Sequence, residues 1–428
     1  MLDRTKAPEI KEIDAVSLQV AEVSHLSNGV KLHIIKSETQ PVIRLDFVFK
    51  AGKVYETVKG ASDLSAKMLF EGTTNYTAKQ IAETVAFYGA SFDNNHGYDR
   101  SEYTLYCLSK YVPDLLPVVL DVLQNPIFPA EEFAILKNRN QQNLKIQRSK
   151  NNYLATHSFT KLIYGDDHPY VFGYDESELD AITLEDVKLF YNNNYSLEGL
   201  EIFACGDISD AVEELLIKDL SELKAPSNAL GNAKFETTKA KENAEAFEEI
   251  KDSLQSSIRT GLMFPHITHH DFHKLTVLNE ILGGYFGSRL MRNIREEKGY
   301  TYGIYSTISP KEKDSMFYIG TDVNYEVTDK TVAEIRKEIK LLQDELVDEE
   351  ELKTVQSYMI GKFLNNIATI FEQADKYKRI VLFSLQPEFY SNYITTIRTI
   401  TPEEIQELAV KYLSLNNFKT AIAGRKAE

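Results

Sequence analysis

The stretch ITLEDV, Ile182 to Val187, recurs later in the chain as ITPEEI, Ile400 to Ile405. In both copies a threonine precedes an acidic residue by three positions, which is the pattern of a capping box at the start of a helix. Each copy then continues through an amphipathic segment into an apolar strand that ends in glycine. The spans Thr183 to Gly206 and Thr401 to Gly424 both advance by 23 residues. Equal spacing with matched chemistry indicates that the chain is a duplication.

The segments before these copies repeat a coarser plan. In each half a helix leads through a turn to another helix, and a glycine (Gly89 or Gly299) then opens two alternating strands. We therefore predict an α+β fold of two duplicated domains, each an antiparallel sheet covered by helices, facing each other as a clamshell. The predicted boundaries are 1–222 for the N-terminal domain, 223–246 for a polar linker and 247–428 for the C-terminal domain.

Length, composition and charge narrow the classes of partner. A chain of 428 residues is too long for one typical core, and 43% hydrophobic with 26% charged residues is typical of a globular protein. The formal net charge of -16 argues against a nucleic-acid surface and disfavours docking on anionic membranes. The polar N-terminus and the lack of a membrane-spanning apolar run predict a cytoplasmic protein with no membrane partner.

Two further patterns are interpreted as structural. The cysteines Cys107 and Cys205 are too few for a disulfide framework or a four-cysteine zinc site, and both lie in apolar strand sequences. The glycine-rich segment GGYFG, Gly283 to Gly287, lacks the Lys-Ser/Thr of a phosphate loop. We expect it to let the backbone pass close to a neighbouring segment or a peptide.

The densest cluster of histidines is HITHHDFH, His266 to His273. Spacings of three and four residues place some of these side chains on one helix face, so a zinc site is one interpretation. The other is a polar connection between the strand 258–264 and the following helix, which Thr268 or Asp271 could cap. No downstream Glu or Cys completes a metal motif, so we predict no metal in this chain. His96 is interpreted as a hydrogen-bonded structural histidine.

The segment SRLMRNIREEKGYTYG carries arginines followed by tyrosines. Arg289, Arg292 and Arg295 are spaced by three residues, which places them along one edge of a helix. Gly299 ends that helix, and Tyr302 follows on an extended segment. An arginine at a helix end beside a strand tyrosine gives two donors aimed at one carbonyl, which suits the binding of a peptide. The alternative is a solvated charged helix beside an aromatic strand face.

Two segments, GGYFGSRLMRNIREEKGYTYG (Gly283 to Gly303) and KGASDLSAKMLFEGTTNYT (Lys59 to Thr77), resemble the insulinase/pitrilysin peptidases, or inverzincins. With the duplication and the linker, the resemblance covers nearly the whole chain. In active members of that family the second segment carries the zinc-binding H-x-x-E-H helix.

The H-x-x-E-H positions are degenerate in this chain. Asp63 and Lys67 stand at the two histidine positions, and Ala66 stands where the family has the Glu that activates water. A more distant acidic ligand is expected on the long helix of this half, but residues 133–152 contain no Asp or Glu. Catalytic zinc needs three protein ligands and a base beside its bound water. The resemblance therefore implies no complete catalytic site in this chain.

By resemblance, Arg295 and Tyr302 fall on the family's substrate-binding Arg and Tyr, which in two-chain members lie on the chain without zinc. This implies a non-catalytic, substrate-binding subunit of a heterodimeric zinc metallopeptidase that cleaves peptides. The subunit is expected to be inactive alone, with zinc in a homologous partner subunit that carries H-x-x-E-H. Peptides in the family add to an edge strand, and the comparable segment here contains Phe92, Asp93 and Asn94. Its polar residues are weak strand formers.

Two other functions stay open. The first is a structural scaffold, like the core proteins of respiratory complexes that share this fold, in which the arginine and tyrosine have no role in proteolysis. The second is a metalloenzyme that uses the cluster His266 to His273.

Overall fold

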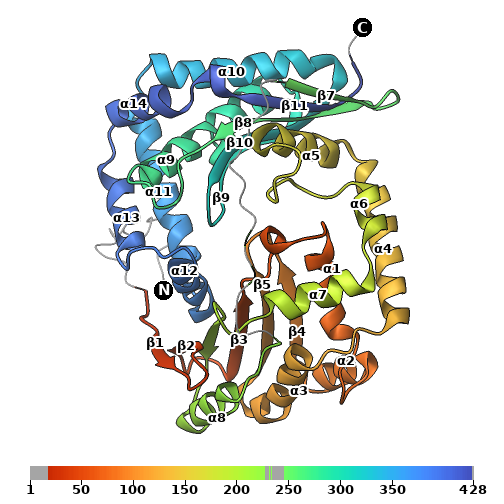
Figure 1. Cartoon of the computed structure of the whole chain (residues 1–428). Coiled ribbons are helices and arrows are strands. Elements are labelled where there is room, and N and C mark those ends of the chain that lie inside the picture. Colours follow the sequence, from red (N-terminus) through yellow and green to blue (C-terminus); the bar gives the residue numbers. More distant parts are fainter. Residues whose placement is uncertain (1–17, 227–230, 232, 234–244, 427–428) are drawn as a thin grey trace, which may run out of the picture.

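The computed structural model describes residues 18–226, 231, 233 and 245–426. Its strands form two sheets, one in the lower part of Figure 1 and one in the upper part, with helices packed around each. We call residues 18–226, which form the lower sheet, the N-terminal domain, and residues 245–426, which form the upper sheet, the C-terminal domain. The predicted α+β fold of two similar domains that face each other is confirmed.

The N-terminal sheet has six strands in the order β1-β2-β6-β3-β5-β4, so β4 lies at an edge. Its strands are β1 (Glu22–His25), β2 (Lys31–Lys36), β3 (Val42–Phe49), β4 (Ser91–His96), β5 (Ser101–Leu108) and β6 (Glu201–Gly206). The pair β2 and β6 is parallel, and the other neighbouring pairs are antiparallel. The parallel pair exists because the last strand of the domain returns beside an early one after a long connection.

The C-terminal sheet has five strands in the order β7-β11-β8-β10-β9, so β9 lies at an edge. Its strands are β7 (Glu245–Glu249), β8 (Gln255–Met263), β9 (Thr301–Pro310), β10 (Ser315–Asn324) and β11 (Lys419–Gly424). The pair β7 and β11 is parallel and the rest are antiparallel. Both sheets are therefore mainly antiparallel, as expected, and each adds one parallel pair at the equivalent place.

The helices follow the same order in both domains. In the N-terminal domain they are α1 (Ala61–Met68), α2 (Ala78–Phe87), α3 (Val112–Gln124), α4 (Ala130–Arg148), α5 (Asn151–Tyr164), α6 (Glu176–Ala181), α7 (Leu184–Asn194) and α8 (Asp210–Ser221). In the C-terminal domain they are α9 (Phe272–Asn279), α10 (Thr328–Asp344), α11 (Glu349–Asn365), α12 (Ile370–Leu382), α13 (Phe389–Thr399) and α14 (Pro402–Tyr412). Two wider π-helical segments, Glu280–Gly284 and Met291–Glu297, separate α9 from β9.

The repeated capping motif begins equivalent helices in the two domains. Thr183 Oγ1 accepts a hydrogen bond from the Asp186 amide at 3.2 Å, and Thr401 Oγ1 accepts one from the Glu404 amide at 3.3 Å. The two acids in turn accept from the threonine amides. The helices α7 and α14 both have 11 residues, and the strands β6 and β11 both have 6. The predicted duplication is confirmed.

The two domains exchange a helix. The helix α5 of the N-terminal domain packs on β8 and β11 of the other sheet, and its counterpart α12 packs on β6 of the N-terminal sheet. The ring of Phe159 on α5 lies 5.9 Å from that of Tyr318 on β10. Met316 and Ala421 of the C-terminal sheet belong to the same apolar cluster as Phe159. Because each domain covers part of the other's sheet, the exchange stabilises the pair of domains as one unit.

Ion pairs fix α12 on the N-terminal sheet. Lys378 Nζ lies 2.9 Å from the carboxylate of Asp46 and also binds Glu102. Arg44 donates to Asp375 of α12 at 2.7 Å. The Asp46 side chain is almost fully buried, so its charge depends on these partners.

The Lys378→Met variant is expected to lower the free energy of unfolding by about 1 to 3 kcal/mol, because it removes one of the two cations beside the buried Asp46 carboxylate and leaves Arg44, whose Nε lies 3.1 Å away. Urea unfolding measures the loss. Lys340→Met is the matched control, since Lys340 forms an exposed pair with Asp344 at 2.7 Å and its removal is expected to cost less than about 0.5 kcal/mol. Equal losses in the two variants would show that α12 is not held by this ion pair.

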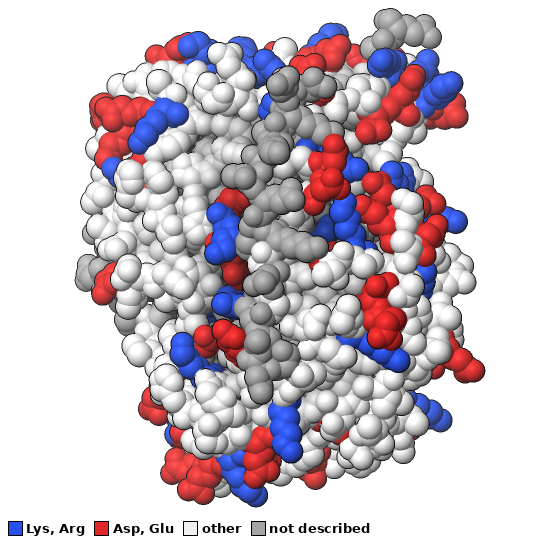
Figure 2. Space-filling view, viewed as in Figure 1, with Lys and Arg blue, Asp and Glu red and all other residues white. Residues whose placement is uncertain are grey.

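The predicted linker, residues 223–246, lies largely outside the described residues, and β7 begins within its last two residues. In the part of the chain that the structure describes, no helix combines the length and the apolar character needed to cross a bilayer. On the face shown in Figure 2, acidic and basic side chains are interspersed.

Candidate functional site

The degenerate motif lies on α1, whose packing face is intact. The helix follows Gly60, whose φ of 89° is in the left-handed region that favours glycine. Leu64, Ala66 and Met68 are buried. The hydroxyl of Tyr103 on β5 donates to the Ala66 carbonyl at 3.2 Å. This segment therefore keeps the helix and its place against the sheet.

The polar face of α1 forms hydrogen bonds with Asn140 of α4. Lys67 Nζ donates to Asp63 Oδ2 at 2.7 Å, one helical turn away. Asn140 Nδ2 donates to the same oxygen at 3.2 Å, and Asn140 Oδ1 lies 3.5 Å from Lys67 Nζ. The carboxylate, the ammonium group and the amide thus satisfy one another.

These three residues do not fit a zinc ion. A catalytic zinc site needs three ligands such as imidazole, thiolate or carboxylate, and only Asp63 offers one here. The ammonium group of Lys67 places a positive charge where a cation would bind. Ala66 carries no group that could act as a base.

His96 lies beside this cluster and is held from both sides. Its Nε2 is 2.9 Å from Ser62 Oγ, and its Nδ1 is 2.9 Å from Ser101 Oγ. Ser62 also binds Glu56 through its amide and hydroxyl. Burial lowers the pKa of His96 to about 4. The structure places His96 as a hydrogen-bonded residue, as predicted, and its lowered pKa makes it neutral at pH 7.

The lowered pKa of His96 predicts a loss of stability in mild acid. The unfolded imidazole has a pKa of about 6.5. The contribution of neutral His96 to the free energy of unfolding is therefore fully present above about pH 6.5. It declines as the pH falls towards about 4, the pKa of His96 in the folded chain. For one proton the slope is at most about 1.4 kcal/mol per pH unit. The His96→Asn variant, measured by urea unfolding at neutral and mildly acidic pH, is expected to show a shallower loss than the wild type. An unchanged slope would contradict the assigned protonation state.

The second candidate group, Arg295 and Tyr302, lies in the C-terminal domain. Arg295 Nε donates to the Tyr302 carbonyl at 3.0 Å, so the structure brings the two predicted residues together. Tyr302 lies on the edge strand β9, and its side chain is 95% exposed. Arg295 lies in the second π-helical segment, a type of turn that is often found at functional sites.

A β-bulge sets the direction of Tyr302. Tyr302 and Gly303 together lie opposite Asp322 of β10, because the pairing shifts between Thr321 and Val323. The Thr321 hydroxyl donates to the Gly303 carbonyl at 3.0 Å, which holds the bulge. Bulges at sheet edges commonly redirect a side chain next to an active site.

The guanidinium group of Arg295 also packs on an aromatic ring. Its Cζ lies 4.6 Å from the centre of the Phe286 ring, within the range of a cation–π contact. Phe286 belongs to the glycine-rich segment, whose Gly283 passes close to β9. A Cβ on Gly283 would lie 2.7 Å from the Ser306 nitrogen, which confirms the expected close approach.

The three arginines do not act as one basic edge. Arg289 makes a bidentate pair with Glu351 of α11, at 3.0 and 2.7 Å, and its side chain is largely buried. The interpretation of a shared edge with Arg292 and Arg295 is wrong, because Arg289 is committed to packing against α11 and the π-helical turn alters the spacing.

The predicted substrate-contact strand is β4, at the edge of the N-terminal sheet. The Phe92 side chain is buried and its ring lies 5.0 Å from that of Phe70, so it belongs to the core. Asp93 is exposed. Asn94 Nδ2 is buried with no hydrogen-bond partner among the described residues.

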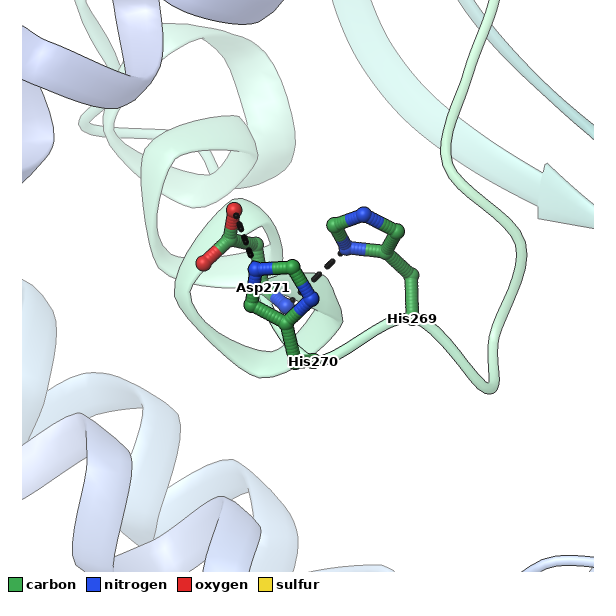
Figure 3. Close-up of side chains that lie close together, drawn as sticks. All are labelled: His269, His270 and Asp271. Atoms are coloured by element: carbon green, nitrogen blue, oxygen red, sulfur yellow. Dashed lines mark hydrogen bonds and ion pairs between the residues drawn. The ribbon is translucent and has the colours of Figure 1, made fainter.

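The histidine cluster forms the connection before α9 (Figure 3). The ligand atoms of His269, His270 and Asp271 lie within 4.8 Å of one another. However, the Asp271 carboxylate accepts hydrogen bonds from Lys411 at 3.1 Å and the Tyr412 hydroxyl at 2.6 Å. The nearby ammonium group opposes a cation, and this arrangement favours the polar connection over a metal site.

The capping expected for α9 is wrong. Asp271 occupies the N-cap position, but its side chain makes no hydrogen bond to the helix because it binds Lys411 and Tyr412 instead. The Thr268 hydroxyl lies 2.9 Å from His266 Nδ1 and is likewise not the cap.

Two residues of these sites were not identified from the sequence. Asn140 could not be recognised, because α4 contains many polar residues and no local sequence pattern distinguishes this asparagine from the others. Phe286 was hidden because its contact with Arg295 depends on the fold of the glycine-rich segment. The cysteines Cys107 and Cys205 are buried in strands, as expected.

Two family descriptions match the chain. Residues 32–165 match the family described as "Insulinase (Peptidase family M16)", and residues 181–359 match "Peptidase M16 inactive domain". The first range contains α1 and the second contains Arg295 and Tyr302.

The chain is also similar to whole proteins of nearly equal length. The "Uncharacterized zinc protease YmxG" of Bacillus subtilis is 23% identical over 393 residues, covering 89% of this chain and 93% of the relative. The "Non-peptidase homolog YmxG" of Helicobacter pylori is 23% identical over 427 residues, covering 96% of both chains.

Solved structures share the fold. A peptidase M16 inactive domain from Pseudomonas fluorescens superimposes with a TM-score of 0.87 at 23% identity, covering 95% of this chain and 98% of that chain. A protease from Helicobacter pylori superimposes with a TM-score of 0.85 at 18% identity, covering 95% of this chain and 100% of that chain.

Proposed function

The chain belongs to the insulinase family of peptidases, M16, and from this premise we propose that it is the non-catalytic, substrate-binding subunit of a two-chain zinc metallopeptidase. Its substrates would be peptides. Its partner would be a homologous chain that carries H-x-x-E-H and the zinc ion. Both chains would be cytoplasmic.

The observation that supports this proposal most strongly is the contrast between the two candidate sites. At the zinc positions, Asp63, Lys67 and Asn140 bond to one another and Ala66 supplies no base. In the other domain, Arg295 and Tyr302 are held side by side, and the tyrosine side chain is exposed. The first site lacks the groups that zinc chemistry needs, whereas the second holds polar groups at an exposed position, and this contrast supports the proposal.

The arginine and tyrosine have the groups needed to bind a peptide backbone. With Nε bonded to the Tyr302 carbonyl, the remaining N–H groups of Arg295 can donate to a carbonyl oxygen. Among the described residues its ion-pair partner is Glu296, at 3.9 Å, which leaves the guanidinium group weakly paired. The edge strand β9 adds backbone groups to which an extended peptide could bond.

The test is reconstitution with the partner. The isolated chain is expected to bind no stoichiometric zinc and to cleave no peptide. A mixture with the H-x-x-E-H chain of the same source is expected to cleave peptides faster than that chain alone. If the mixture gains no activity, the chain is not a peptidase subunit. Co-purification with a membrane respiratory complex would then support the scaffold function.

A further inference from the structure

A cavity of about 250 Å³ lies within the C-terminal domain, between α9, α11, α12, α13 and the end of β9. It borders β9 from Thr307 onward, five residues beyond Tyr302, which is roughly 16 Å along an extended strand. The cavity is therefore separate from the arginine and tyrosine site, and what it binds does not depend on the proposed function.

Polar atoms without partners are concentrated around this cavity. Within the described part of the chain, fourteen buried side-chain nitrogen or oxygen atoms have no hydrogen-bond partner. Four of them belong to residues that line the cavity: His273 Nδ1, Asn279 Oδ1, Arg379 Nε and Tyr390 Oη. Tyr390 is only 9% exposed, so its hydroxyl cannot be satisfied by bulk water. Buried polar groups are normally paired, so these four residues of the cavity wall carry polar groups that a ligand could bind after small side-chain rotations.

The charge in the cavity is positive. Lys376 and Arg379 of α12 both line it, and neither has a carboxylate within 4.0 Å among the described residues. The acid Glu280 is already paired with Lys362 at 3.0 Å. Burial, and next the charge of Arg379, lower the pKa of Lys376. Two cations without an ion-pair partner among the described residues favour an anion, although Asp375 and Glu372 lie near enough to Lys376 to offset part of its charge.

The remaining walls are apolar. They include the aromatic rings of Phe272, Phe363 and Phe389, together with Ile308. The His273 imidazole also lies against Phe389, with ring centres 4.4 Å apart, and burial lowers its pKa to about 4, so it is neutral at pH 7. An inorganic ion would leave these walls uncovered, whereas a ligand with an apolar group would bury them.

We propose that this cavity binds a small ligand that joins a carboxylate to an apolar side chain through an amide-bearing carbon. Arg379 and Lys376 would bind the carboxylate, and the Tyr390 hydroxyl would donate to it. Asn279 Oδ1 would accept from the amide N–H of the ligand. Such chemistry occurs in the C-terminal residue of a peptide and in a free N-acylated amino acid, and the volume suits about one residue.

Calorimetric titration of the isolated chain tests the proposal. The probes are N-acetyl-phenylalanine, its neutral C-terminal amide, and a tetrapeptide acid that ends in phenylalanine. The acid is expected to bind at least about tenfold more tightly than the amide, because charge-assisted hydrogen bonds are lost in the neutral probe. Tighter binding of the tetrapeptide would identify a peptide terminus as the source. Binding of the free acid alone would identify free N-acyl amino acids.

Variants locate the binding in this cavity. Arg379→Gln and Lys376→Gln are each expected to lower the affinity for N-acetyl-phenylalanine by about tenfold. Tyr390→Phe removes only the hydroxyl group and is expected to lower the affinity for the same probe several-fold. Lys353→Gln on α11, outside the cavity, is the matched control and is expected to change nothing. Equal affinity for acid and amide, or no effect of the two cation variants in folded protein, would overturn the proposal.

Discussion

The Arg295→Ala variant is expected to lower kcat/KM of the reconstituted peptidase by about 10²-fold, or about 2.7 kcal/mol of transition-state stabilisation. The guanidinium group is fixed by its bond to the Tyr302 carbonyl and its contact with the Phe286 ring, so its free N–H groups are preorganised. Truncation removes both the donors and their orientation. The loss is therefore expected to exceed that of a single hydrogen bond.

Tyr302→Phe, which removes one exposed hydroxyl, is expected to cost about tenfold. Initial rates on a fluorogenic peptide, measured with saturating partner chain, give both values. Arg336→Ala on α10 is the control, since Arg336 forms one long ion pair among the described residues, with Glu245 at 4.0 Å. Its activity is expected to match the wild type. Wild-type rates in the Arg295→Ala and Tyr302→Phe mixtures would refute the proposed substrate-binding role and leave the scaffold function.

The triple variant Asp63→His/Lys67→His/Asn140→Glu is expected to bind about one zinc ion per chain, where the wild type binds none at these positions. The side chains of the three residues meet within 3.5 Å, and α1 and α4 keep their packing. Two imidazoles and a carboxylate at these places supply the three ligands that zinc requires. Elemental analysis and competition with a chromogenic chelator measure the gain.

A matched variant tests whether Asn140 marks the third ligand position. Asn138 is exposed on the opposite face of α4, and its side chain accepts a hydrogen bond from Gln142 at 2.9 Å. Asp63→His/Lys67→His/Asn138→Glu has the same composition as the first triple variant, but its carboxylate points away from α1. Its zinc affinity is expected to be at least about tenfold lower. Equal affinities would mean that Asn140 does not lie at the zinc position.

Zinc bound to the wild-type chain would indicate a site other than the α1 positions. If purified protein carried one zinc ion and lost it in the His269→Ala variant, the histidine cluster would be a metal site. The contacts of Asp271 with Lys411 and Tyr412 argue against that result.

The duplication and the loss of the zinc motif were determined by the sequence itself. A capping box needs only two residues three positions apart, so the local sequence at Thr183 and at Thr401 predicts the start of a helix. The missing ligands are likewise a matter of residue type, since Ala66 cannot act as a base in any fold. Arg295 and Tyr302 were singled out by the resemblance to the family, and the structure brings these two residues together through one hydrogen bond.

The rest was decided by tertiary structure, because it depends on contacts between residues far apart in the chain. Asn140 meets Asp63 across 77 positions, so no local pattern marks it among the other polar residues of α4. The exchange of α5 and α12 depends on which sheet the apolar face of each helix covers. Both sheets have an apolar face, so the sequence of the helix alone does not specify its sheet. The bulge at Tyr302 arises only when β9 pairs with β10. The cavity beside Arg379 is formed by four helices and a strand, and its unpaired groups become visible only when these elements are packed together.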